Sequence, residues 1–166
     1  MRTLRGEAIV LEPQVAAHAA ELFPVLSDAD LYVFTDDKEP ASEAALRERF
    51  VRLESRQSPD GAQRWLNWVV RGGSGAAVGY VQATVRPGGE AEIAYVLGRQ
   101  HWRRGYAFAA CTAVLAELAK AYGVARVTAT LDPRNAASLA LLKKLGLGLV
   151  AEDAQAQEVT YARDLR

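Results

Sequence analysis

The chain has 166 residues, half of them apolar, and its 20 basic and 20 acidic side chains cancel to a formal net charge of zero. A chain of this size can bury an ordinary core without disulfides or metal, so we expect one domain spanning residues 1–166. Without a basic excess, neither nucleic acid nor an anionic membrane is an expected partner, since both attract proteins through positive charge.

Cysteine and histidine are too sparse for a disulfide framework or a zinc site, with one cysteine and two histidines in the whole chain. Cys111 falls within an alanine-rich helical pattern, where a small core residue is expected. The first residues lack the apolar segment of a signal peptide, and no later run approaches the ~20 apolar residues of a membrane span. We therefore expect a soluble, cytoplasmic protein without a metal.

The first part of the chain predicts a strand and two helices. The strand is expected at residues 7–11, followed by an alanine-rich helix at 13–26 and a second helix at 43–54. Residues 27–40 mix acids and aromatics without periodicity, which favours a loop that contacts substrate. The acids within it suit a cationic amine, although a lone charge run is also typical of a solvated loop.

Three strands are predicted next. Residues 64–71 and 76–86 are rich in Val, Trp, Tyr and Thr, and the Gly-Gly-Ser-Gly between them favours a hairpin. The turn Arg-Pro-Gly-Gly leads into a third strand at residues 90–97. This part of the sheet should be antiparallel.

The remaining segments alternate helix and strand patterns. Apolar residues spaced by three and four predict a helix at 106–122, and the later elements are a strand at 124–131, a helix at 135–145, and strands at 147–150 and 158–165. A strand–helix–strand unit favours a parallel pair. The fold class is therefore α/β (α+β), with a mixed, mostly antiparallel sheet of about seven strands and about four helices.

The junction between the strand at 90–97 and the helix at 106–122 is the most informative segment. The N–H groups of a first helical turn lack partners and, with the helix dipole, favour an anion. Gly105 and Ala107 leave room for a ligand to approach the backbone. Positive charge comes from Arg99, Arg103 and Arg104. The junction predicts a pyrophosphate site.

Three pieces of the chain resemble the GNAT superfamily of acetyl-coenzyme A-dependent acetyltransferases, in particular the branch of the ribosomal-protein N-terminal acetyltransferases. They are E-I-A-Y-V-L before the loop, W-R-R-G-Y-A within it, and N-A-A-S-L-A-L-L-K-K-L-G-L in the next helix. The resemblance implies a splayed pair of central strands and acetyl-coenzyme A as cosubstrate. It also implies direct acetyl transfer to a primary amine, either a protein N-terminal α-amine or a small-molecule amine.

The resemblance further implies which residues bind coenzyme A. The pantetheine arm would lie against the backbone of Tyr95, Val96 and Leu97. The rest of the molecule would contact the loop and the two helices beside it, at Arg99, Trp102, Arg103, Arg104, Gly105, Tyr106, Ala107, Asn135 and Ser138. Asn135 and Ser138 also suit a helix N-cap and first turn, which explains both residues without a ligand.

Catalytic roles are considered under the mechanism that the resemblance implies. Glu92 is the candidate general base acting through water, with Glu152 as second choice, and Ser138 is the candidate to protonate or orient the leaving thiolate. Arg103 stands where this branch commonly has glycine, which puts the backbone freedom of the loop in question. Leu142 stands where many relatives have a proton-donating tyrosine, so that role must move or vanish.

Alternatives remain open at this point. The missing tyrosine also suits a catalytically weak acyl-coenzyme A-binding sensor or scaffold. A nucleotide-binding protein of another fold is disfavoured, because the chain lacks G-x-x-x-x-G-K-[ST] and no G-x-G-x-x-G opens the helix. The acceptor is not specified by these patterns, and the protein could be a monomer or a homodimer.

Overall fold

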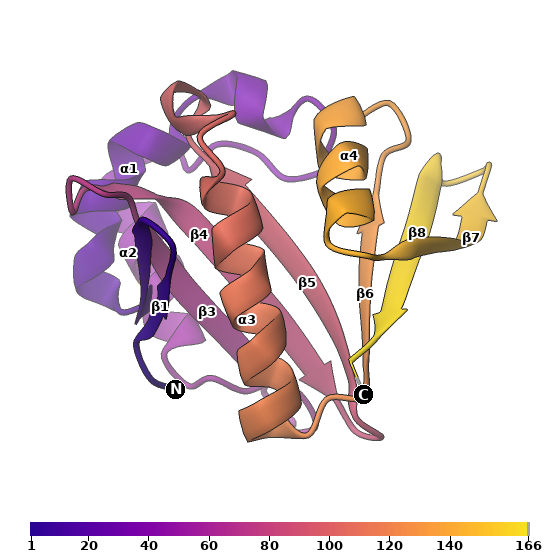
Figure 1. The fold of residues 1–166 in the computed structure, drawn as a ribbon. Coiled ribbons are helices and arrows are strands. Elements are labelled where there is room, and N and C mark those ends of the chain that lie inside the picture. The colour runs from indigo at the N-terminus through magenta and orange to yellow at the C-terminus, as the bar shows by residue number, and fades with distance from the viewer. Residues whose placement is uncertain (166) are drawn as a thin grey trace.

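The computed structural model describes residues 1–165, in which eight strands form one sheet with helices on both faces (Figure 1). The strand order is β1-β2-β3-β4-β5-β6-β8-β7, so only the last two strands depart from chain order. The strands are β1 (Leu4–Gly6), β2 (Ile9–Pro13), β3 (Arg64–Arg71), β4 (Ala77–Arg86), β5 (Glu90–Leu97), β6 (Arg126–Leu131), β7 (Gly148–Asp153) and β8 (Glu158–Asp164).

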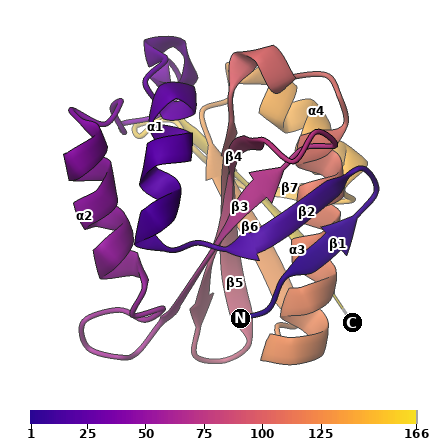
Figure 2. The ribbon, with the colours of Figure 1, turned by 90° about the vertical axis from the view of Figure 1, so that its left-hand side faces the viewer.

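Within residues 1–165, four α-helices cover the sheet, two on each face (Figure 2). They are α1 (Ala19–Leu26), α2 (Glu43–Leu53), α3 (Tyr106–Tyr122) and α4 (Ala136–Lys144). The pair α1 and α2 lies on one face, and α3 and α4 lie on the other. Local signals explain the ends of these helices: the Ser42 hydroxyl accepts the Ala45 N–H at the start of α2, and Gly123 ends α3 at φ 66°.

The core is divided by the sheet into two layers. Trp68 of β3 packs toward α3 with Val114, whereas the next residue, Val69, packs toward α1 and α2 with Leu22 and Phe50. Successive strand residues point to opposite faces, so a strand buried on both faces reads as a continuous apolar run. Each such side chain contributes about 1.5–3 kcal/mol when it is fully buried.

The two central strands β5 and β6 separate along their length. They are parallel and pair only at their first three residues, from Glu90 with Arg126 to Glu92 with Thr128. Beyond that point β6 pairs with β8, and β5 keeps its antiparallel partner β4. The result is a V-shaped opening between β5 and β6 (Figure 1). The mixed sheet and the splayed central pair expected from the sequence are confirmed.

The N-terminal elements differ from the sequence expectation. The predicted strand at 7–11 is a hairpin of β1 and β2, which raises the strand count from about seven to eight. Its turn passes through Ala8 at φ 57°, a conformation that alanine does not signal. The helix predicted at 13–26 begins later than expected. Pro13 still belongs to β2, the 3₁₀ turn η1 (Ala16–His18) follows, and α1 begins at Ala19.

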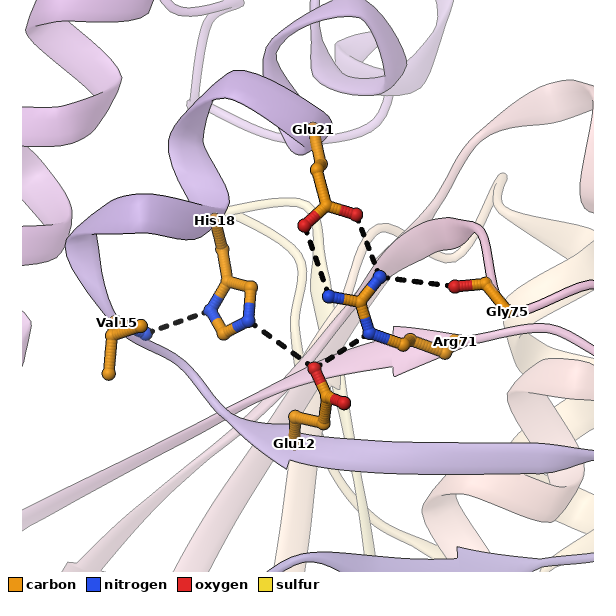
Figure 3. A network of polar contacts seen from close by, with 6 residues as sticks. All are labelled: Glu12, Val15, His18, Glu21, Arg71 and Gly75. Atoms are coloured by element: carbon orange, nitrogen blue, oxygen red, sulfur yellow. Dashed lines mark hydrogen bonds and ion pairs between the residues drawn. The ribbon is translucent and has the colours of Figure 1, made fainter.

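A charged network fastens α1 to the sheet (Figure 3). Arg71, at the end of β3, donates from Nε to Glu12 at 2.7 Å and from Nη1 to Glu21 at 2.7 Å and to the Gly75 carbonyl oxygen at 3.1 Å. His18 Nε2 lies 3.4 Å from the same Glu12 carboxylate. Two strands and the start of α1 are thereby held together, which fixes the chain that leads into residues 27–40.

Within the described part of the chain, no helix has the length and apolarity that crossing a bilayer requires.

Candidate active site

The loop between β5 and α3 folds back on the end of β5. After the 3₁₀ turn η3 (Arg99–His101), the Trp102 Nε1–H donates to the Leu97 carbonyl oxygen at 2.7 Å. The chain then passes through left-handed conformations at Arg103, with φ 57°, and at Gly105, with φ 78°. Arg103 therefore adopts the conformation that favours glycine, at a cost of about 1–2 kcal/mol.

The N-terminus of α3 is open toward this loop. No side chain of the described residues caps it, and the helical hydrogen bonds begin with the Ala109 N–H donating to the Gly105 carbonyl oxygen at 3.0 Å. The N–H groups of the three residues between them have no partner within the helix. In the part of the chain that the structure describes, no atom outside the helix backbone and the neighbouring residues lies within 4 Å of where a Gly105 Cβ would be. An anion has both space and donors here.

The three arginines of the loop fall into two groups. Arg103 and Arg104 are exposed and make no ion pair among the described residues, so their charges are available to a phosphate. Arg99 instead pairs with Asp30, and its Nε lies 3.8 Å from Asp28 Oδ2. Asp28 is the N-cap of the 3₁₀ turn η2 (Ala29–Tyr32), and Asp30 lies within it. Arg99 thus ties the β5–α3 loop to the segment between α1 and α2.

His101 contributes a neutral group to the same loop. Its Nδ1 is buried and has no hydrogen-bond partner in the described chain. Burial lowers the pKa of His101, and the nearby Arg104 lowers it further. Sequence reasoning considered this histidine only as a metal ligand, and no group of three or more metal-binding side chains occurs among residues 1–165.

The open edge of β5 carries unpaired backbone groups. The Gly89 carbonyl oxygen accepts from Ala125 on the β6 side, while the Gly98 N–H donates to Val78 on the β4 side, at 2.7 and 2.9 Å. Because backbone groups alternate along a strand, the N–H and C=O groups of odd-numbered residues of β5 point toward β6, and those of even-numbered residues point toward β4. The backbone N–H and C=O of Tyr95 and the N–H of Leu97 therefore face the opening.

Glu92 lies where the V closes, on the face of the sheet away from α3. It sits opposite Thr84 on β4 and Thr128 on β6. Its Oε2 receives a hydrogen bond from Arg86 Nη2 at 2.5 Å, and about a third of its side chain is exposed. The carboxylate is therefore both oriented by a guanidinium and open to solvent.

Ser138 lies on the other side of the sheet, at the start of α4. The Asn135 Oδ1 accepts the Ser138 N–H at 3.1 Å, so Asn135 is the N-cap that the sequence suggested. Burial raises the pKa of Tyr95 to about 12, and an interaction with the Ser138 side chain opposes that rise. Leu142, one turn further along, is 1% exposed within the core.

Residues that the sequence did not single out as catalytic or substrate-binding gather on the opposite face of the sheet, on the side of α1 and α2. Burial raises the pKa of Tyr32 to about 12 and also raises the pKa of Tyr80, while Arg49 lowers both. A cavity of about 10 Å³ lies beside Tyr80, enough for a single water. It is lined by Gln14, Leu26, Leu46, Arg49, Phe50, Leu53, Asn67, Tyr80 and Gln82. Polar residues alternating along a buried strand, as Tyr80 and Gln82 do, are the signal that could have found it.

The other candidate residues lie away from the junction between β5 and α3. Glu152 is exposed on the edge strand β7, separated from β5 by β6 and β8. Asp36, Asp37 and Glu39 are exposed in the segment between α1 and α2. Cys111 is fully buried in α3, and burial raises its pKa to about 12, which fits the expected core role.

Comparison with known proteins identifies the family. The family model described as acetyltransferase (GNAT) domain matches residues 8–148, and the chain belongs to this family. The protein is accordingly an acyltransferase. No match is found among curated proteins.

Solved structures share the fold over nearly the whole chain. RimJ of Mycobacterium smegmatis in complex with CoA-disulfide is 21% identical, with coverage of 98% of this chain and 85% of that one and a TM-score of 0.80. Ribosomal-protein-S5-alanine acetyltransferase of Vibrio fischeri is 15% identical, with coverage of 98% and 96% and a TM-score of 0.80. RimL, a ribosomal L7/L12 alpha-N-protein acetyltransferase, is 17% identical, with coverage of 98% and 93% and a TM-score of 0.83.

Proposed function

We propose that this protein transfers an acetyl group from acetyl-coenzyme A to a primary amine by direct attack of the amine. The single observation that carries the proposal is the open N-terminus of α3 beside the unpaired edge of β5. The N-terminus of α3 can bind a diphosphate, and the unpaired edge of β5 can bind an extended arm that carries a thioester. Catalysis at such a site depends mainly on positioning and on stabilising charge.

The residues at this junction fit coenzyme A. The free N–H groups of the first turn of α3, at Tyr106 and Ala107, would bind the diphosphate together with Arg103 and Arg104. Backbone groups of Tyr95 and Leu97 would bind the pantetheine arm, since they face the opening. The thioester would supply an activated acetyl group. A backbone N–H on this edge of β5 would stabilise the oxyanion that develops on it.

Glu92 would act as the general base through a water molecule. At pH 7, removing a proton from a lysine amine with a pKa near ~10.4 costs about 4.6 kcal/mol, whereas a peptide α-amine near ~7.8 costs about 1. A carboxylate is a weak base in general, which suits the α-amine better than the lysine amine. Ser138, on the α4 side of the opening, would orient the leaving thiolate.

The acceptor is proposed to be a protein or peptide N-terminus. Two of the similar structures are named as acetyltransferases of ribosomal proteins, and this supports a protein N-terminus over a small-molecule amine. The exposed acids Asp36, Asp37 and Glu39 would attract the positive charge of the incoming amine.

The test is release of free coenzyme A thiol with a panel of amines that includes alanine- and serine-starting peptides and polyamines. We expect release that depends on a peptide, and mass spectrometry should locate the acetyl group on the α-amine. Thermal stabilisation by acetyl-coenzyme A without thiol release for any amine would contradict the proposal. That result would favour the sensor or scaffold alternative, which the buried Leu142 motivates.

A further inference from the structure

The β5–α3 loop and the chain around α1 meet at two neighbouring contacts. Gly98, the first residue of the loop, lies directly against α1, because a Cβ on Gly98 would stand 2.9 Å from Val25 Cγ1. One residue further on, Arg99 pairs with Asp30, and its Nε lies 3.8 Å from Asp28 Oδ2. The first contact joins the loop to the helix, and the second joins it to η2, which follows the helix.

The segment that begins at η2 has little else to fix its place. No residue from 28 to 39 is buried, and Leu31, which packs at the edge of the core, stays partly exposed. Its hydrogen bonds include a local one, in which the Asp30 N–H donates to Asp28 Oδ1 at 3.1 Å. A local bond shapes a turn without placing it relative to another segment, whereas the pairing with Arg99 reaches across to the loop.

Arg99 is also the arginine of the loop that is least available to a phosphate. Its charge faces two carboxylates, whereas Arg103 and Arg104 make no ion pair among the described residues. A phosphate that approached Arg99 would meet the negative charge of Asp28 and Asp30, and like charges repel. The loop arginines therefore divide into two that suit the diphosphate and one that is engaged elsewhere.

We propose that Arg99 is a positioning residue for the acceptor: through Asp28 and Asp30 it holds residues 28–39 at the open end of the V, and it does not bind phosphate. The segment crosses the end of the sheet at which β5 and β6 separate (Figure 1). Its exposed apolar and acidic side chains are Val33, Phe34, Asp36, Asp37 and Glu39. This inference rests on the proposed function, because it concerns how the acceptor reaches the same site.

The sign of one effect separates positioning from charge alone. Removing a cation near the acceptor would, by charge alone, strengthen the binding of a positively charged amine. Losing the position of the segment would weaken it. We therefore expect Arg99→Met to raise the KM for an alanine-starting peptide by about three- to fivefold, the scale of an exposed ion pair. The kcat and the calorimetric affinity for acetyl-coenzyme A should stay within about twofold of wild type.

Variants on the other side of the contact complete the test. Asp28→Asn combined with Asp30→Asn removes both charges, and asparagine can still cap η2. This variant should raise the KM as Arg99→Met does, and all three substitutions together should raise it no further. Arg126→Met is the matched control. Its pair with Asp164 is similarly exposed, 40% and 70% against 48% and 61%, and lies beside the first residue of β5, so the KM should not change.

Hydrogen exchange gives a readout that does not depend on activity. With coenzyme A bound, the amides of residues 28–35 should exchange about threefold faster in Arg99→Met than in the wild-type protein. Residues 102–109 should exchange alike in both. Equal exchange at residues 28–35 would overturn the inference.

The kinetic outcomes separate this inference from the proposed function. A lowered KM for the peptide in Arg99→Met, or a loss of affinity for acetyl-coenzyme A by about tenfold, would overturn the role of Arg99 and leave the proposed function in place. A wild-type protein that releases no thiol with any amine would overturn the proposed function, and the acceptor role of Arg99 with it.

Discussion

Glu92 and Thr128 are the last pair of residues at which β5 and β6 lie side by side. Beyond them β5 continues to Leu97 with an open edge, and β6 continues to Leu131 against β8. The carboxylate of Glu92 therefore stands at the closed end of the V, and the unpaired backbone lies beyond it on the same strand. One strand thus aligns the proposed base with the proposed binding groups for the thioester arm.

Glu92→Gln should lower kcat with a peptide acceptor by about a hundredfold or more, because general-base catalysis contributes on this scale. Binding of acetyl-coenzyme A, measured by calorimetry, should be unchanged. Glu152→Gln discriminates between the two candidate bases. Because Glu152 is exposed on β7, its substitution should leave kcat unaffected, and an equal or greater loss there would contradict the assignment to Glu92.

Gly105→Ala should weaken acetyl-coenzyme A binding by about tenfold, since the new Cβ occupies the space above the N–H groups of α3. Gly61→Ala is a matched control, because both glycines have a positive φ, 78° and 72°, and open space around the added Cβ. Both variants should lose about 1–2 kcal/mol of unfolding free energy through backbone strain. Equal affinities for acetyl-coenzyme A in calorimetry would show that the helix N-terminus is not the anion site.

Arg71→Met should destabilise the protein by about 2–3 kcal/mol in urea unfolding, because Glu12 and Glu21 lose their shared partner. Arg71 is only 18% exposed, which limits the screening of its charge by water. Arg134→Met removes an arginine that is 67% exposed and paired with Asp132, and it should cost less than about 1 kcal/mol. Similar losses in the two variants would contradict the anchoring role of Arg71.

Stability should fall as the pH drops through and below 6.5, partly because of His101. The pKa of His101 is lowered in the folded protein, so the folded state binds fewer protons than the unfolded chain in this window. Unfolding free energy therefore rises with pH and is fully recovered above the unfolded value of 6.5. His101→Gln should flatten this dependence between pH 5.5 and 7, and an unaltered slope would contradict the assignment.

The sequence predicts the central elements closely, because their signals are local. Residues 90–97 alternate between buried and exposed positions and are bounded by glycines, and residues 106–122 carry a helical apolar pattern that ends at Gly123. The structure has β5 and α3 at these bounds. The β1 hairpin is missed because Ala8 makes its turn, and alanine has no turn signature. Local patterns work where the residues that decide a structure are neighbours in sequence.

The site is predicted less completely, because its contacts join distant segments. The charge of the β5–α3 loop is visible in the sequence, but the pairing of Arg99 with Asp28 and Asp30 spans about 70 residues and leaves no periodic trace. The burial of Leu142 depends on how α4 packs against the core of the sheet. Such relationships require the fold before they can be found.

Calorimetric titration with acetyl-coenzyme A tests the central claim most directly. The wild-type protein should bind one equivalent, and Arg103→Ala combined with Arg104→Ala should lower the affinity by about tenfold or more, because both guanidinium groups are expected to pair with phosphate. No binding by the wild-type protein, or an undiminished affinity in the double variant, would contradict the claim that the β5–α3 junction holds the diphosphate.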